Sequence, residues 1–91
     1  GFVCARRGGT TASFDILNKY FTICGMAVAS SQYWNNIHGG AAGEAEKDAE
    51  GMQTARTLAH NMSFLIKAIL LGKEKFGLPS KENREWTNFI R

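Results

Sequence analysis

Two long stretches of the chain repeat apolar residues at helical spacing. Over residues 11–24, and again over residues 46–71, apolar positions follow one another at intervals of three and four. Because this spacing places side chains on one face of an α-helix, it predicts two amphipathic helices. The stripe of the first helix is Phe14, Leu17, Phe21 and Cys24, and that of the second is Met52, Ala55, Ala59, Met62, Ile66 and Ile69.

Local signals predict where the two helices begin and end. Thr10 or Thr11 can cap the first helix by accepting a hydrogen bond from its free N–H groups, and Gly25 suits a left-handed end. Gly72 is the predicted stop of the second helix. Its start is favoured by acidic residues, whose negative charge complements a helix N-terminus. These residues are Glu44, Glu46, Asp48 and Glu50.

Two short, continuous apolar runs predict strands at about residues 2–6 and 26–31. The order is then strand, helix, strand, helix, which is typical of a parallel sheet in an α/β fold. Two strands and two helices cannot cover both faces of such a sheet. We therefore expect the 91 residues to form the C-terminal β-α-β-α part of a doubly wound domain, followed by a mostly polar tail at residues 73–91.

Composition narrows the class of protein. The formal net charge is +3 and the basic residues are scattered, so there is no basic stripe of the kind that binds nucleic acid. No apolar run approaches the roughly 18 residues of a membrane-spanning helix. Cys4 and Cys24 stand alone in apolar surroundings, which is typical of reduced, buried thiols in a cytoplasmic protein. We expect no metal, nucleic-acid or membrane partner.

Two polar loops follow the predicted strands. One is RRGGTT, at residues 6–11, and the other is SQYWNNIHGG, at residues 31–40. In a parallel sheet both loops would emerge at the carboxyl ends of the strands, which is the edge where open α/β sheets bind ligands. Guanidinium and amide donors, glycine backbone and aromatic faces together suit a flat aromatic ligand.

Four segments carry a resemblance to a known family. They are ARRGGTTASFDILNKYF, GM-V-SQYWN, EAEKDAEGMQTARTLAHNM and TNFIR, and together they span nearly the whole chain. The chain resembles the C-terminal half of flavodoxin-like NAD(P)H-dependent FMN reductases, in the branch of iron-sulfur flavoproteins and quinone-reductase-like proteins. The resemblance implies a five-stranded flavodoxin-like fold that binds FMN, with the fourth and fifth strands supplied here. It also implies NAD(P)H as co-substrate and a homodimer or homotetramer.

The resemblance implies that the loop after the fourth strand lies against the isoalloxazine ring. In this sequence that loop is Arg6, Arg7, Gly8, Gly9 and Thr10. A guanidinium, glycine N–H groups and a helix N-terminus would stabilise the negative charge of reduced flavin near its N1 and C2 oxygen. The alternative is an ordinary turn with two solvated arginines.

Tyr33, Trp34 and Asn35 form the second candidate set. They could be a wall of the site that stacks on flavin, nicotinamide or substrate. The alternative is a hydrophobic plug between the second predicted strand and the last helix, or a subunit contact. His38 could donate a proton to a quinone or nitro substrate, but a loop histidine beside two glycines is expected to be exposed. No catalytic side chain is required, because the cofactor carries the chemistry.

The expected function is that of an FMN-dependent NAD(P)H oxidoreductase, which passes hydride from nicotinamide to FMN and on to a quinone, flavin or nitro acceptor. Two alternatives stay open: a flavodoxin-type electron carrier without substrate turnover, and a segment with no activity of its own. Arg6 and Arg7 oppose the carrier, since such carriers keep positive charge away from the flavin. The family's phosphate-binding loop has no counterpart in the 91 residues, so we expect the segment alone to bind FMN weakly or not at all.

Overall fold

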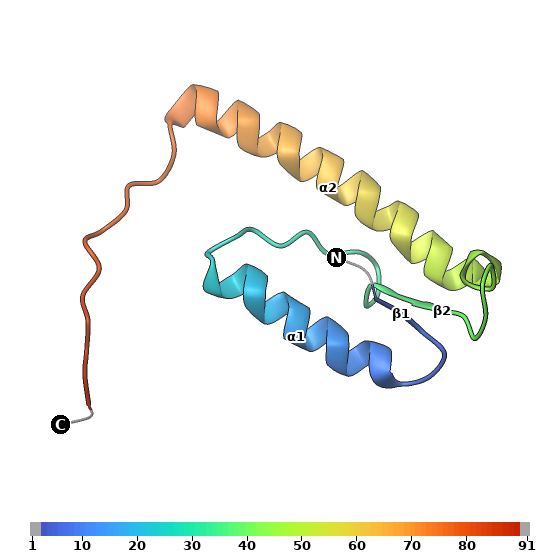
Figure 1. The fold of residues 1–91 in the computed structure, drawn as a ribbon. Helices are drawn as coiled ribbons and strands as arrows, with labels where there is room; N and C mark the ends of the chain where they lie inside the picture. The colour runs from blue at the N-terminus through green and yellow to red at the C-terminus, as the bar shows by residue number, and fades with distance from the viewer. Residues whose placement is uncertain (1–2, 90–91) are drawn as a thin grey trace.

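The computed structural model describes residues 3–89, in which two long helices accompany two short strands (Figure 1). Along the chain the elements are β1 (Val3–Ala5), α1 (Gly9–Ile23), β2 (Asn36–His38), the 3-10 helix η1 (Ala45–Lys47) and α2 (Ala49–Phe76). Phe2, which belongs to the first predicted strand, lies outside the described residues, as do Ile90 and Arg91 of the predicted tail.

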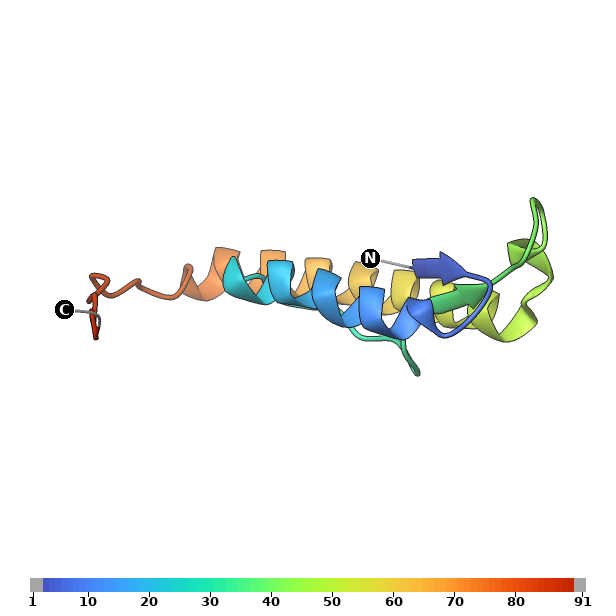
Figure 2. The same ribbon diagram turned by 60° about the horizontal axis from the view of Figure 1, so that its bottom comes forward.

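The two strands pair in parallel. They are in register over all three residues of each strand, with Ala5 opposite His38. α1 and α2 flank the strands in Figure 1, and Figure 2 shows the same elements stacked in a flat slab. The slab is only 18 Å deep, against 49 and 46 Å in the other two directions. Both strands end at the same edge, where the chain continues into Arg6 after β1 and into Gly39 after β2.

The predicted fold class is wrong. The chain is mostly helical, and the strands of the described region, β1 and β2, have three residues each. A flavodoxin-like doubly wound sheet needs several parallel strands, typically of about five residues, between two layers of helices. Two strands of this length make a narrow ribbon, so residues 3–89 form no such sheet.

Residues 26–31 are not the predicted second strand. No described strand pairs with this segment, which runs between α1 and α2 (Figure 1). It is held to α2, because the Ser31 hydroxyl donates to the Thr54 carbonyl oxygen at 2.7 Å and the Asn61 side-chain amide donates to the Ser30 carbonyl oxygen at 2.7 Å. An apolar run becomes a strand only when a neighbouring strand satisfies its backbone groups. Here β1 pairs instead with β2, within a stretch predicted to be a loop.

α1 begins at Gly9, two residues before the predicted start. Its N-cap is Gly8, which makes no side-chain cap hydrogen bond, so the predicted cap by Thr10 or Thr11 is wrong. Thr10 lies inside the first turn and is 1% exposed. The predicted left-handed end of this helix at Gly25 is confirmed, since Gly25 has a φ of 67°.

α2 continues beyond Gly72, so the predicted stop there is wrong. The helix ends at Phe76, and the N–H of Gly77 donates to the carbonyl oxygen of Lys73 at 2.9 Å. Gly77 has a φ of 75°, in the left-handed region, whereas Gly72 is not among the glycines with a positive φ. A glycine therefore ends this helix only where the backbone turns left-handed. Beyond Gly77 the chain runs away from the helices without regular structure (Figure 1).

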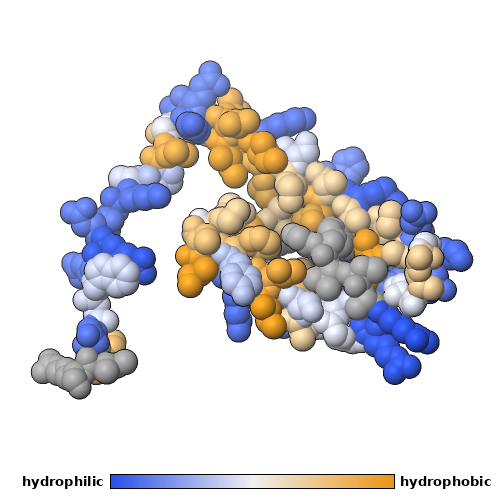
Figure 3. Space-filling view, viewed as in Figure 1, coloured by the Kyte–Doolittle hydropathy of each residue, from blue (hydrophilic) through white to orange (hydrophobic). Residues whose placement is uncertain are grey.

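Very little apolar surface is covered. Leu58 is the one buried hydrophobic side chain among those that the structure describes. Figure 3 shows hydrophobic surface along the C-terminal half of α2 and over the end of α1. Cys24 is exposed as well, so its predicted burial is wrong. Exposed apolar side chains of the two helices include Ile16, Ile23, Phe64, Ile66, Leu70 and Leu71.

Candidate functional site

The N-terminus of α1 is open and positively charged. Arg6 and Arg7 precede it directly and both are exposed, as are Gly8 and Gly9. The first turn contains no acidic residue, and the N-cap residue Gly8 has no side chain that could accept a hydrogen bond from the free N–H groups. The first N–H groups of an α-helix have no partner within the helix and carry partial positive charge. This end of α1 therefore offers hydrogen-bond donors and two guanidinium groups to an anion.

Arg6 lies beside the loop that follows β2. Its Nε is 3.4 Å from the position that a Cβ on Gly40 would take. In the same loop the Glu44 carboxylate accepts hydrogen bonds from the N–H groups of Gly40 at 2.8 Å and Ala41 at 3.0 Å. Neither Arg6 nor Arg7 forms an ion pair with any residue in the described range 3–89. As far as the described residues are concerned, both guanidinium groups are available to a ligand.

Two glycines leave space at this end of α1. Nothing lies within 4 Å of the positions that a Cβ on Gly8 or Gly9 would take. Their N–H groups can therefore be approached closely, as the glycines of phosphate- and ring-binding loops require. The structure thus brings together the whole first candidate set, Arg6 to Thr10, although Thr10 contributes from a buried position.

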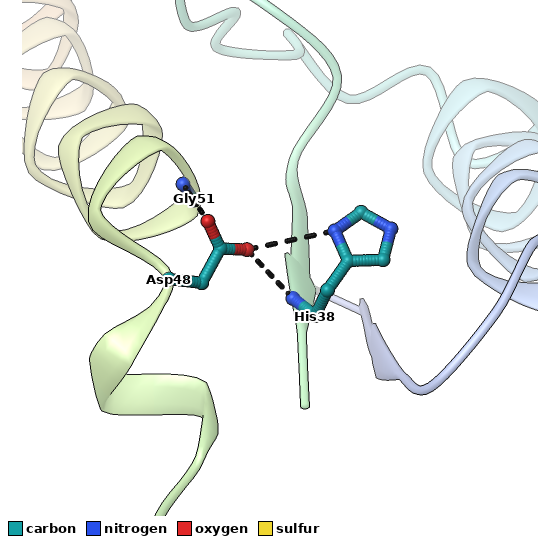
Figure 4. A network of polar contacts seen from close by, with 3 residues as sticks. All are labelled: His38, Asp48 and Gly51. Carbon is teal, nitrogen blue, oxygen red and sulfur yellow. Dashed lines mark hydrogen bonds and ion pairs between the residues drawn. The ribbon is translucent and has the colours of Figure 1, made fainter. Parts of the chain in front are cut away.

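The N-terminus of α2 is closed by an acidic cap (Figure 4). The Asp48 carboxylate accepts a hydrogen bond from the N–H of Gly51 at 2.9 Å through Oδ1 and from the N–H of His38 at 2.8 Å through Oδ2. Nδ1 of His38 lies 3.5 Å from the same Oδ2. Asp48 therefore joins the end of β2 to the first turn of α2.

These contacts keep Asp48 ionised. The backbone N–H groups of Gly51 and His38 stabilise the carboxylate and lower the pKa of Asp48 below its ordinary value of 3.8, and the His38 side chain contributes in the same direction. The His38 side chain is 54% exposed, as expected from the sequence, and its Nδ1 also lies beside the Asp48 carboxylate, a contact that was not predicted. An aspartate directly before a helix commonly accepts a hydrogen bond from the N–H three residues later, so the sequence could have predicted the bond between Asp48 and Gly51, but not the contact with His38.

Tyr33, Trp34 and Asn35 lie at the other end of β2. They precede the strand, whereas Arg6 follows β1, so the parallel strands separate the two candidate sets. Asn35 and Gly39 are roughly 13 Å apart along the strand, at about 3.3 Å per residue. The structure therefore does not gather both sets at one edge. A strand at residues 26–31 would have placed Tyr33, Trp34 and Asn35 after its carboxyl end, but β2 begins at Asn36, so these residues precede the strand.

Tyr33, Trp34 and Asn35 line a groove between α1 and residues 28–35, with a volume of about 350 Å³. The rings of Tyr33 and Trp34 are 5.4 Å apart at their centroids and tilted by 40°. Both side chains are exposed, whereas Asn35 is 6% exposed. The plug predicted as the alternative would bury both aromatic rings, so the structure favours neither a covered plug nor a shared site with Arg6.

Two kinds of feature are missing from the described residues. No three side chains of His, Cys, Asp or Glu come close enough together there to hold a metal ion. In the same part of the chain, neither helix combines the length and the apolar character that a membrane crossing requires.

Comparisons with known proteins give no assignment. The chain matches no protein-family model, no curated protein and no solved structure. Its function is therefore inferred from its own residues and their geometry.

Proposed function

We propose that the chain belongs to an FMN-dependent NAD(P)H oxidoreductase and that its Arg6–Thr10 loop receives the electron-rich edge of the flavin. One observation carries the proposal: two exposed arginines, which form no ion pair with the described residues, directly precede a helix N-terminus that has neither a side-chain cap nor an acidic residue in its first turn. Surface arginines are common, but here they share one end of a helix with free N–H donors. That combination is suited to an anionic or electron-rich ligand.

The residues of this loop fit the group by their chemistry. The pyrimidine edge of a reduced flavin carries negative charge, and guanidinium and backbone N–H groups are donors for such an edge. Gly8 and Gly9 leave the backbone accessible, since nothing lies within 4 Å of where their Cβ atoms would be. The negatively charged Glu44 is nearby, but its Oε2 is occupied by the N–H groups of Gly40 and Ala41.

The chain's own contribution is orientation and electrostatics. When bound, FMN supplies the hydride chemistry between NAD(P)H and a quinone, flavin or nitro acceptor. Arg6 and Arg7 would stabilise negative charge on the ring and favour hydride acceptance. The α1 N-terminus would add donors that need no rearrangement, because the helix already holds them in position.

The exposed apolar faces of α1 and α2 support association with further copies of the chain. With Leu58 as the single buried hydrophobic side chain in the described region, α1 and α2 present apolar surface that is unfavourable in water. In the proposed function a homodimer or homotetramer covers part of this surface, in the cytoplasm. Sedimentation of the chain over a range of concentrations tests this, and a monomer at every concentration would contradict it.

NADPH oxidation by the protein at its natural length tests the function. We expect turnover that depends on FMN and on a quinone acceptor. Replacing Arg6 and Arg7 by alanine removes up to two charge-assisted hydrogen bonds and is expected to weaken FMN binding roughly tenfold or more.

The matched control replaces two cations of the exposed tail, Lys81 and Arg84, by alanine. This variant has the same net charge as the first, so it separates a local effect of the loop from a general effect of charge. Equal FMN affinity in both variants would contradict the role of the loop. FMN binding without NADPH oxidation by any acceptor would instead indicate an electron carrier.

A further inference from the structure

One stripe of α2 has the spacing of a coiled-coil seam and is largely uncovered. Its positions follow one another at alternating intervals of three and four residues, which is the a/d pattern of a heptad repeat. From Ala59 onward every position of the stripe is exposed, and this half of the helix stands apart from α1 (Figure 1). Such a stripe in water favours a second helix as its cover. It consists of Met52, Ala55, Ala59, Met62, Ile66, Ile69, Lys73 and Phe76.

A hollow in the stripe has the form of a helix-packing hole. It has a volume of about 330 Å³ and is lined by Ala59, Met62, Ser63, Ile66 and Lys67. The first four of these residues lie at positions i, i+3, i+4 and i+7. In a coiled coil, four side chains at this spacing surround one side chain of the facing helix. Because Ala59 is small, the hollow has room for a large aliphatic side chain.

The stripe is complementary to itself when two copies of α2 run antiparallel. A twofold axis midway between Met62 and Ile66 places Ile66 of one copy over the hole around Met62 of the other. In the same register the large Ile69 faces the small Ala59. The overlap covers residues 52–76, or about 36 Å of helix. The opposed positions are 52 with 76, 55 with 73, 59 with 69, and 62 with 66.

Charges favour the antiparallel direction over the parallel one. In a parallel pair Lys73 would face Lys73 of the other copy within the seam, and the two ammonium groups would repel each other. In the antiparallel pair Lys73 lies over the small Ala55, and Arg56 comes opposite Glu74 on the flank. Neither Arg56 nor Glu74 forms an ion pair with any residue in the range 3–89. Both are therefore available for a contact between copies.

We propose that residues 52–76 of α2 form the interface of a homodimer in which the α2 helices of two copies pair antiparallel. A twofold contact requires a surface that complements itself, and this stripe does so in apolar character, side-chain size and charge. The inference rests on the homo-oligomer of the proposed function and names its interface. It does not depend on FMN.

Sedimentation of the chain compares charged substitutions on α2. Ile66→Glu places a carboxylate in the hole and should raise the dissociation constant of the dimer roughly a hundredfold or more. Leu71→Glu is the matched control, because Leu71 is 65% exposed against 53% for Ile66 but lies on the opposite side of the helix, and its dimer should be unchanged. Glu74→Arg should weaken the dimer roughly fivefold, and adding Arg56→Glu should restore it.

Cross-linking tests the direction of the pairing in a chain that carries Cys4→Ser and Cys24→Ser. A short bismaleimide should join Ala59→Cys to Ile69→Cys when the two variants are mixed, because these positions face each other in the antiparallel register. It should join neither variant to itself. A parallel pair would give the reverse pattern.

Any of three results would overturn the proposal. They are a monomer at every concentration, which would leave this face to another segment or another protein; equal effects of Ile66→Glu and Leu71→Glu; and cross-linking of either cysteine variant with itself in place of the mixture. A monomer would also contradict the proposed homo-oligomer, whereas FMN binding by the Arg6–Thr10 loop would be unaffected. If circular dichroism shows that Ile66→Glu does not fold, the cross-linking pattern decides the question.

Discussion

The two helices of this chain begin in opposite ways. α1 starts at a glycine without a side-chain cap, behind two arginines that form no ion pair within residues 3–89. α2 starts behind Asp48, whose carboxylate is bound by the N–H groups of Gly51 and His38. Both N-termini have the same backbone donors and the same direction of dipole. At α2 a side chain of the chain itself satisfies these donors, and at α1 they are left for something else.

The difference separates a structural role from a binding role. Asp48 connects β2 to α2 and contributes to the fold, so its loss should destabilise the protein. Arg6 and Arg7 make no ion pair in the described region, so their loss should cost little stability and should affect ligand binding.

Gly51→Ala should have the largest effect. A Cβ on Gly51 would come within 2.5 Å of the Asp48 carboxylate and 3.1 Å of the Asn36 carbonyl oxygen. Overpacking of this kind costs about 1–3 kcal/mol, which exceeds the gain of up to about 1 kcal/mol from replacing a helical glycine. Urea unfolding followed by circular dichroism measures the change. The matched control is Gly72→Ala on the same helix, where nothing lies within 4 Å, and it should stabilise the chain.

Asp48→Ala should destabilise the start of α2 at neutral pH, because the N–H groups of Gly51 and His38 lose their acceptor. Asp48→Asn keeps an oxygen that can accept the bond from Gly51 and should retain more of the stability. Hydrogen exchange of the Gly51 amide follows the effect directly. Equal exchange in Asp48→Ala and the unaltered chain would show that the cap contributes nothing.

The same contact predicts a pH dependence. The pKa of Asp48 in the folded chain is lowered from 3.8, so the unfolded chain binds the proton more readily. The stabilisation is therefore fully present well above pH 4 and is lost as the pH falls through the lowered pKa. Unfolding measured from pH 7 to pH 2 should show this loss in the unaltered chain and a smaller loss in Asp48→Asn. Parallel curves for the two proteins would contradict the prediction.

Thr11→Glu should make the two helix ends more alike. A carboxylate in the first turn of α1 complements the helix dipole, which is worth about 0.3–1 kcal/mol. The variant should therefore be slightly more stable and should bind FMN more weakly, since the carboxylate competes with the ligand. Increased stability with unchanged FMN affinity would show that the ligand does not use this end of α1.

Replacing Arg6 and Arg7 by alanine should have the smallest effect on stability. Surface substitutions without partners usually change it by no more than about 0.5 kcal/mol. The urea midpoint should therefore stay close to that of the unaltered chain. A loss as large as that of Gly51→Ala would reveal a structural role for the arginines and would weaken the case for a binding loop.

The helices could be predicted from the sequence, but their surroundings could not. Apolar spacing depends only on local geometry, so it located α1 and α2. It did not reveal that the 26–31 run lacks a strand partner, because pairing depends on distant residues. Gly72 and Gly77 look alike in sequence, and only the backbone angle tells the helix interior from its end.

In the candidate site, too, sequence-local features could be predicted and contacts between distant residues could not. Arg6 to Thr10 are contiguous in sequence, so they come together in any fold, and their role in binding stays a prediction. The contact between His38 and Asp48 joins residues ten positions apart and depends on how η1 leads from β2 into α2. The separation of Tyr33, Trp34 and Asn35 from Arg6 follows from the strand register, which the misplaced strand at 26–31 concealed.

An NMR titration of the ¹⁵N-labelled chain with FMN compares the two helix ends in one experiment. The account predicts saturable shifts of the backbone N–H signals of Gly8, Gly9, Thr10 and Thr11, even if the affinity is weak, and no comparable shifts at Glu50 and Gly51. Shifts of equal size at both helix ends, or shifts at Glu50 and Gly51 without shifts at residues 8–11, would contradict it.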